Sequence, residues 1–365
     1  MKNLLKILSL LTIAGFILTS CEGPMGPQGP AGTNGTNGTN GVDGKDGIDA
    51  NQTCTLCHTG SADLENKQAQ WGRSMHANGE NAAYANRAGC TQCHVSQSFL
   101  ESVAEGSTAD LSVQTDPMQI NCYTCHKIHD TFTADDWALT KPGAETLVLK
   151  YAGAALTWDQ GNSNQCAACH QARDVSPAPV IDGADFAVTS SRIGVHHAPM
   201  TNFMLGKIPF ELAGTAYPTT NPHLADDGCI SCHMATPYGY LAGGHNMGVT
   251  YDAHGTETLL TTGCLVCHTS NTAATMATKM NTLKAEVEDK LADLEAQLTA
   301  AGIYNATTEL ANTGTYNANI VLAYLNFNAV VEDKSMGAHN PSYIKTLLDN
   351  SIAEMVDLGY DVPAK

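Results

Sequence analysis

Residues 122–126 read Cys-Tyr-Thr-Cys-His, and this Cys-x-x-Cys-His spacing occurs six times in the 365-residue chain. The cysteine pairs are Cys54 and Cys57, Cys90 and Cys93, Cys122 and Cys125, Cys166 and Cys169, Cys229 and Cys232, and Cys264 and Cys267. The histidines that follow them directly are His58, His94, His126, His170, His233 and His268. The fold therefore has to accommodate the same local structure six times within 215 residues.

This spacing is that of a c-type haem attachment site. Two thiols one helical turn apart can form thioethers along one porphyrin edge, and the imidazole that follows then becomes an iron ligand. A zinc half-site and a redox-active dithiol are the alternatives. Only 14 of the 365 residues are histidine, yet one follows every pair, and zinc ligation does not demand that uniform offset. The sequence thus predicts six covalently bound haem c groups.

The predicted haem density determines the expected fold class. Aromatic residues make up only 6% of the chain, so the porphyrins themselves, with their flat apolar faces, are expected to fill the interior. We expect a mainly α fold with much irregular structure, packed around the haems and completed by C-terminal helices. A polypeptide this short cannot keep the porphyrins apart. We therefore expect a continuous series of haems that exchange electrons with one another.

Eight histidines outside the motifs are available as second axial ligands, two more than six irons require. They are His76, His129, His196, His197, His223, His245, His254 and His339. An iron with both axial positions occupied favours electron transfer, whereas an open position permits binding or catalysis. The surplus of histidine therefore predicts bis-histidine haems. Most of the twelve methionines are expected to pack against porphyrin faces.

Local context ranks these candidates. His129 stands three residues after His126, so it is expected to project from the same short helix toward a neighbouring haem. His76 lies between the first two motifs. His245 follows two glycines that allow the backbone to approach a porphyrin closely. His223 precedes the fifth motif by six residues.

The other four candidates are less alike. Of the adjacent His196 and His197, one is expected to ligate and the other to contact a propionate. His339 stands at the start of a predicted helix and is expected to deliver a ligand from the C-terminal region. His254 is the weakest candidate.

The N-terminus reads as an export signal. Lys2 and Lys6 precede an apolar run over 8–18 that is too short for a membrane-spanning helix. The order Leu-Thr-Ser-Cys at 18–21 resembles a bacterial lipobox, in which Cys21 is diacylated and becomes the new N-terminus. The alternative is an ordinary signal peptide with a leftover cysteine. Cys21 is the one cysteine of 13 outside the six pairs, which favours the lipobox.

Glycine then recurs at every third position from 23 to 47. Such Gly-X-Y triplets resemble collagen, although only three prolines support a triple helix here, so a flexible hydrophilic tether is the alternative. Either structure would act as a spacer.

Three apolar segments follow the last motif. Met276 to Gly302 shows apolar residues at spacings of three and four, as in an amphipathic helix. A second segment covers 320–331. A third helix is expected to begin with Asn340 as its cap and Pro341 at its first position, and to end before Gly359. These helices are expected to pack on the haem region or to pair between subunits.

Several stretches resemble bacterial multihaem cytochromes of the extracellular electron-transfer type. They are Arg192-Ile-Gly-Val-His-His-Ala-Pro, Cys229-Ile-Ser-Cys-His-Met with Gly243-Gly244-His245 downstream, and Ala338-His339-Asn340-Pro341. The resemblance implies low-potential bis-histidine haems that exchange electrons with partners outside the cell. The C-terminal helices also look like the superfamily of ammonia-forming nitrite reductase and hydroxylamine oxidoreductase. The chain lacks the Cys-x-x-Cys-Lys motif of the former, so no enzyme is predicted.

The sequence is thus interpreted as five segments with one function. They are a signal peptide at 1–20, a lipidated N-terminus at 21–22, a collagen-like spacer at 23–49, a hexahaem cytochrome domain at 50–270 and a helical region at 271–365 that supplies one ligand. The expected function is electron transfer at the outer cell surface, on a lipid anchor in the outer membrane.

The expected partners are redox proteins or extracellular electron acceptors and donors. A net charge of −18 argues against nucleic acid. A homo-oligomer through the collagen-like segment or the C-terminal helices is a further expectation. Two alternative functions remain open. One is a reductase or oxidase of a small nitrogen or sulfur compound, for which Arg73, Arg87, Arg173, Arg192 and Lys207 are available to hold an anion, and the other is a subunit of a haem filament.

Overall fold

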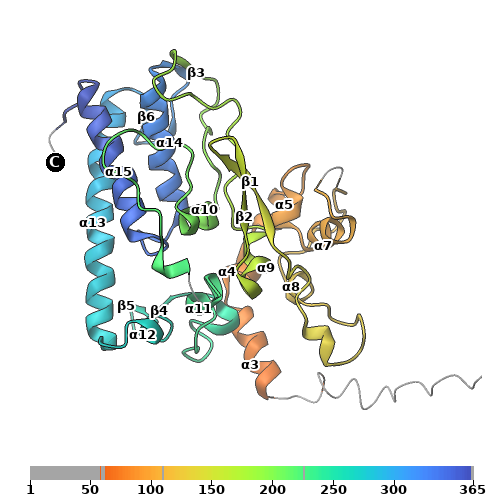
Figure 1. The fold of residues 1–365 in the computed structure, drawn as a ribbon. Coiled ribbons are helices and arrows are strands. Elements are labelled where there is room, and N and C mark those ends of the chain that lie inside the picture. The colour runs from red at the N-terminus through yellow and green to blue at the C-terminus, as the bar shows by residue number, and fades with distance from the viewer. Residues whose placement is uncertain (1–57, 59–61, 109–110, 225–226, 363–365) are drawn as a thin grey trace, which may run out of the picture. The chain divides into compact units, whose positions relative to one another are not determined.

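Short helices and loops form the part of the molecule that carries the motifs, and three long helices form its C-terminal part (Figure 1). The computed structural model describes residues 58, 62–108, 111–224 and 227–362. Cys21, the Gly-X-Y segment, Cys54 and Cys57 lie outside these residues, so the anchor, the spacer and the first cysteine pair stay predictions.

Few of the helices before residue 270 exceed two turns. The α-helices are α3 (Ala62–Trp71), α4 (Met75–Asn78), α5 (Asn81–Tyr84), α6 (Thr91–His94), α7 (Ser96–Glu105), α8 (Cys122–Cys125), α9 (Asn164–Ala167), α10 (Met200–Leu205), α11 (Cys229–His233) and α12 (Cys264–Cys267). The 3₁₀ helices are η1 (Ala134–Trp137), η2 (Gly161–Ser163), η3 (Pro222–Leu224) and η4 (Gly244–Asn246). This agrees with the expected mixture of short helices and irregular structure.

Small antiparallel sheets, which we did not predict, occur in both the motif region and the C-terminal part. Within the described residues each sheet has two strands. The pairs are β1 (Glu145–Tyr151) with β2 (Ala154–Trp158), β3 (Phe186–Val188) with β8 (Gly314–Tyr316), β4 (Thr250–Asp252) with β5 (Glu257–Leu259), and β6 (Tyr304–Asn305) with β7 (Leu310–Ala311). Strands β3 and β8 pair Phe186 with Tyr316 and so tie the motif region to the C-terminal part.

The three C-terminal helices begin and end close to their predicted positions. They are α13 (Ala273–Ala300), α14 (Ala318–Asp333) and α15 (Pro341–Asp357). The side chain of Asn340 accepts a hydrogen bond from the Tyr343 amide at 3.4 Å, and Pro341 occupies the first helical position. Helix α13 also has an N-cap, Thr272, whose side chain accepts from the Thr275 amide.

The main hydrophobic core lies between these helices and residues 149–212 (Figure 1). Leu298, Val321 and Leu347 from the helices are fully buried in it, as are Phe203 and Ile208 from the motif region. The C-terminal helices therefore share one core with the haem region, and all described residues belong to one compact unit.

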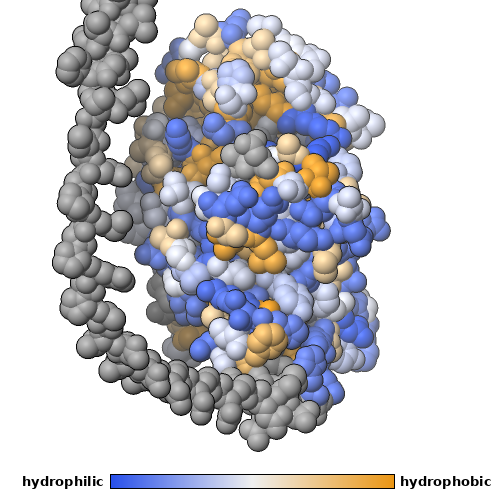
Figure 2. All heavy atoms as spheres, turned by 90° about the vertical axis from the view of Figure 1, so that its right-hand side faces the viewer, coloured by the Kyte–Doolittle hydropathy of each residue, from blue (hydrophilic) through white to orange (hydrophobic). Residues whose placement is uncertain are grey.

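The surface mixes apolar and hydrophilic residues, as Figure 2 shows for the side that lies at the right of Figure 1. Among the described residues, no helix is both long and apolar enough to cross a membrane.

Leu347→Ala should destabilise the chain by about 2–5 kcal/mol, because it removes a fully buried side chain from a close-packed core. Guanidinium chloride unfolding followed by far-UV circular dichroism should show a lower midpoint. Val356→Ala is the matched control in the same helix. Val356 is 40% exposed, so its truncation should change stability by no more than about 0.5 kcal/mol. Equal midpoints for both variants would contradict the packing described.

Candidate haem-ligand sites

Each described Cys-x-x-Cys-His motif is built on one helical turn, and we number sites 1 to 6 in chain order. The amides of His126, His170 and His268 donate to the carbonyl oxygen of the first cysteine of their own motif, each at 2.9 Å. This turn brings the two thiols of a motif onto one side of the chain. All ten described cysteines are free thiols, as the thioether chemistry requires.

Every motif histidine faces a second histidine from elsewhere in the chain. The six pairs, with the distance between ring centroids, are His58 and His129 (6.2 Å), His94 and His196 (6.2 Å), His126 and His245 (6.2 Å), His170 and His76 (6.0 Å), His233 and His339 (6.3 Å), and His268 and His223 (6.2 Å). No histidine occurs in two pairs.

This common spacing fits a metal ion between two imidazoles. A metal–nitrogen bond of about 2 Å on each side, plus about 1 Å from nitrogen to ring centre, places two trans imidazole centroids roughly 6 Å apart. Direct ring stacking does not explain the pairs, because their planes are inclined by 33° to 77°. The donor sets therefore fit haem iron with two axial imidazoles.

Hydrogen bonds at Nδ1 orient several of these rings. The Nδ1 atoms of His126, His223 and His233 lie 2.7, 2.7 and 2.8 Å from the carbonyl oxygens of Trp137, Ala338 and Met247. A carbonyl can only accept, so each Nδ1 carries the proton and Nε2 keeps the lone pair for a metal. Such an arrangement is common around metal-bound histidines.

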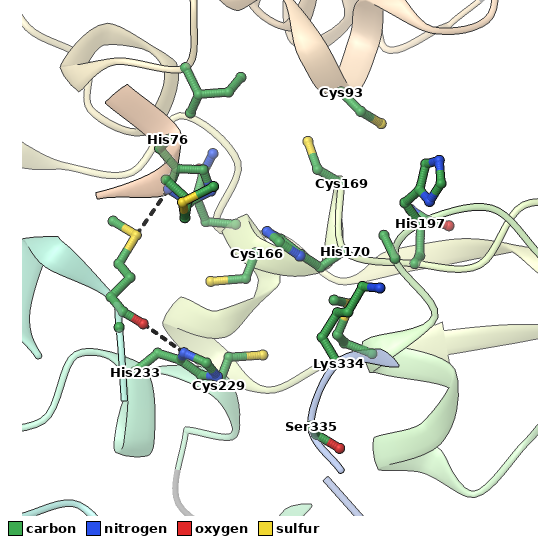
Figure 3. A pocket seen from close by; sticks show the side chains of 18 of the residues that line it. His76, Cys93, Cys166, Cys169, His170, His197, Cys229, His233, Lys334 and Ser335 are labelled. Atoms are coloured by element: carbon green, nitrogen blue, oxygen red, sulfur yellow. Dashed lines mark hydrogen bonds between the residues drawn. The ribbon is translucent and has the colours of Figure 1, made fainter. Parts of the chain in front are cut away.

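Two further Nδ1 contacts have other acceptors. His76 Nδ1 lies 3.1 Å from the thioether sulfur of Met247, and His339 Nδ1 lies 2.6 Å from Asp333 Oδ1. Figure 3 shows the contacts of Met247 with His76 and His233 as dashed lines. Neither Met247 nor Asp333 was singled out from the sequence, because no spacing relates them to a motif.

Sites 2 to 6 line one continuous cavity of about 3020 Å³. It is bordered by all ten described motif cysteines and by the second histidines of these five sites. Around one part of it, Figure 3 shows His76, His170 and His233 together with motif thiols. Burial lowers the pKa of His170 to about 3, with a further contribution from neighbouring histidines. The ring is therefore neutral at ordinary pH, the state in which imidazole binds a metal.

The structure distinguishes the adjacent His196 and His197. His196 faces His94, and burial together with His197 and Arg173 lowers its pKa to about 4. His197 turns to Glu332 instead, with its Nδ1 atom 2.7 Å from Oε2, and this hydrogen bond raises the pKa of His197. His197, named as a candidate ligand, thus faces no motif histidine. Among the described contacts, His254 also has no motif histidine opposite it.

His129 faces His58 of site 1, and its predicted place on the same helix as His126 was wrong. Helix α8 ends at Cys125, and His129 lies in a loop with a φ of 65°. The buried carboxylate of Asp136 holds this loop by accepting hydrogen bonds from the amides of His129 (2.9 Å), Thr131 (2.6 Å) and Phe132 (3.1 Å). Burial acts to raise the pKa of Asp136, but these hydrogen bonds outweigh it and hold the pKa below its usual value.

Contacts between motifs relate the sites to one another, and site 4 lies at their centre. Cys93 Sγ of site 2 lies 4.0 Å from the Ala168 carbonyl oxygen of site 4, and Cys169 Sγ lies 3.9 Å from the Gln92 carbonyl oxygen in return. The thiol of Cys166 in site 4 contacts that of Cys229 in site 5.

The remaining sites connect through side chains next to their motifs. Gln165, beside Cys166, accepts from Thr140 and donates to the Thr124 carbonyl oxygen within the site 3 motif. Sites 5 and 6 meet where Asn221 Nδ2 donates to the His339 carbonyl oxygen at 2.7 Å. The loop that carries His129 joins site 1 to site 3, since it begins directly after His126.

Cys-x-x-Cys-His is the haem attachment motif of c-type cytochromes, and here each such histidine also has a second imidazole opposite it. No protein-family model matches the chain. The chain is 26% identical over 356 residues to "C-type polyheme cytochrome OmcC" of Geobacter sulfurreducens, covering 77% of this chain and 44% of the relative. It is 27% identical over 304 residues to "C-type polyheme cytochrome OmcB" of the same species, covering 67% and 39%.

Among solved structures, "Crystal Structure of Outer Cell Wall Cytochrome OcwA" matches with a TM-score of 0.48 and 19% identity, over 79% of this chain and 50% of that one. The chain thus spans half or less of the length of these proteins. The similarity to these polyhaem cytochromes supports the multihaem c-type cytochrome that the six motifs predict.

Asp136→Ala should loosen the loop that presents His129, because three backbone amides lose their common acceptor. Hydrogen–deuterium exchange should become faster in peptides covering 127–137. Asp135→Ala, which changes the exposed neighbour, should leave the exchange unchanged. Similar exchange in both variants would show that the Asp136 carboxylate does not order the loop.

Proposed function

We propose that this chain transfers electrons through six covalently attached haem c groups, each bound axially by one of the six histidine pairs. The observation that supports this most directly is the narrow range of pair distances, 6.0 to 6.3 Å. The cofactor supplies a one-electron couple at iron. The cysteines would hold it covalently, and both imidazoles of a pair would bind its iron.

The contacts between motifs support an order for electron movement. A path runs from site 1 through sites 3, 4 and 5 to site 6, and site 2 branches from site 4. Each of these steps rests on a loop or side-chain contact given above, and five of the sites border one cavity. Electrons can therefore cross the molecule between sites that lie side by side.

A carrier fits this arrangement better than a reductase or oxidase. An enzyme of that kind needs an open iron position for its substrate, whereas every motif histidine here has a second histidine opposite. An unchanged pair of imidazoles in both oxidation states also keeps the structural rearrangement on electron transfer small.

We further propose that the chain is held at the outer cell surface by a diacylated Cys21 and a Gly-X-Y spacer. This proposal rests on the leader sequence. The net charge of −18 favours redox partners with basic surfaces; extracellular acceptors or donors are the alternative partners.

Replacing a paired histidine outside the motifs by alanine should convert one haem of six into a high-spin form that binds carbon monoxide. His129→Ala, His196→Ala and His339→Ala should each do so in absorption and electron paramagnetic resonance spectra. The matched controls are His197→Ala and His254→Ala, which should convert none. Intact mass should show six haems in every variant, and a native protein that already binds carbon monoxide would contradict the carrier.

Cys21→Ser should release a haem-loaded protein from membranes, because two acyl chains are needed for stable anchoring. Fractionation with haem staining measures the result. Glu22→Gln, beside the cysteine, should stay with the membranes. A Cys21→Ser protein that remains membrane-bound would place the anchor elsewhere.

A further inference from the structure

Helix α14 ends in two consecutive acids, and each carboxylate contacts a histidine. Glu332 contacts His197, which belongs to no pair, whereas Asp333 contacts His339, the second histidine of site 5. The two contacts are alike in length, at 2.7 and 2.6 Å. They differ in that His339 belongs to a histidine pair and His197 does not. Glu332 is therefore a matched control for Asp333.

The Asp333 carboxylate is built into the protein interior. Its side chain is 1% exposed, against 14% for Glu332. The hydroxyl of Ser335 donates to its other oxygen, Oδ2, and the amide of His339 in turn lies 3.3 Å from the Ser335 hydroxyl. Asp333, Ser335 and His339 therefore form a closed turn that fixes the carboxylate on Nδ1 of His339.

The contact of His339 differs in kind from those of the other paired histidines. Within the described part of the chain, three of them, His126, His223 and His233, have Nδ1 on a backbone carbonyl oxygen, and a fourth, His76, has it on the sulfur of Met247. A carboxylate carries a full negative charge and is the strongest acceptor among these groups. The other imidazole of site 5, His233, also donates to an oxygen, that of Met247.

A carboxylate hydrogen-bonded to a metal-bound histidine makes this ligand more basic. Ferric iron carries one more positive charge than ferrous iron, so a more basic ligand and a nearby negative charge both favour the ferric state. Because Asp333 is shielded from water, its charge is screened less than that of a surface acid. Hydrogen bonding around an axial ligand is one of the means by which a protein adjusts the reduction potential of haem.

We propose that Asp333 makes site 5 the site of lowest reduction potential among the six. This inference rests on the proposed function, because it requires haem at His233 and His339. The proposal also ranks the reduction potentials of the neighbouring sites 4 and 5. The Nδ1 atom of His76 in site 4 contacts a thioether and not a carboxylate, so an electron that arrives at the contact of Cys166 with Cys229 resides on site 4 in preference to site 5. Passage to site 6 is thus an uphill step followed by a downhill one.

Asp333→Asn tests the proposal in the haem-loaded protein by spectroscopic redox titration. One haem of six accounts for one-sixth of the absorbance change. The potential of the component that is reduced last should rise, with about a tenfold change in its reduction equilibrium, equivalent to roughly 59 mV for one electron. Glu332→Gln removes the same charge from the preceding residue and should leave this component in place. Asp333→Glu, which retains a carboxylate, should restore most of the native potential. The proposal would be overturned if the potential of this component did not change in Asp333→Asn, or if it changed equally in Glu332→Gln.

A second measurement does not depend on the folding of Asp333→Asn. His339→Ala removes an axial ligand of site 5, so the lowest-potential component of the native titration should be the one that disappears. Its persistence would overturn the assignment even if Asp333→Asn does not fold. The haem count by mass separates the two hypotheses: fewer than six haems, or no new high-spin haem in His339→Ala, would contradict the proposed function itself.

Discussion

The opposition of two imidazoles is the constraint on which the rest of this structure depends. Each motif supplies one ring, and the second ring comes from a distant part of the chain, as with His126 and His245 or His233 and His339. With the proposed haem iron between its two rings, each of the six pairs would cross-link the chain much as a disulfide does in a small secreted domain. Long regular elements are therefore unnecessary before residue 270, where loops, short turns and two-stranded sheets only have to place a histidine opposite a motif.

The C-terminal helices, which pack in a conventional hydrophobic core, hold one of these paired histidines, His339. These helices pack against residues 149–212 in the main hydrophobic core. The connection between α14 and α15 carries a residue of site 5 at each end. Asp333 ends the first helix, and His339 stands just before Asn340, the cap of the second. A side chain presented between two capped, buried helices is held more rigidly than one in an open loop. The same connection also reaches site 6, since the Ala338 carbonyl oxygen faces His223.

The sequence predicts those features of this arrangement that depend on residues close together in the chain. The six motifs, the helix cap at Asn340 and the surplus of two histidines are visible locally. The partner of each motif is not, because pairing is decided by the fold: nothing near His196 and His197 shows which one meets His94. The predicted position of His129 on a continuing helix was wrong, since a loop held by the carboxylate of Asp136 carries this residue instead. Asp333 and Met247 act through distant partners, so no motif marks them.

The loop at 243–248 shows why six sites in so short a chain cannot be independent. His245 faces His126 of site 3, the Met247 sulfur contacts His76 of site 4, and the Met247 carbonyl oxygen contacts His233 of site 5. Gly243 and Gly244 have positive φ, and Gly243 leaves no room for a side chain, because an added Cβ would lie 2.8 Å from the backbone carbonyl oxygen of Ala235. A shift of this loop would alter the second histidine of site 3 and the hydrogen bonds of sites 4 and 5 together. Because one backbone segment sets the surroundings of three consecutive sites, a change in this segment would affect the proposed haems of sites 3, 4 and 5 together.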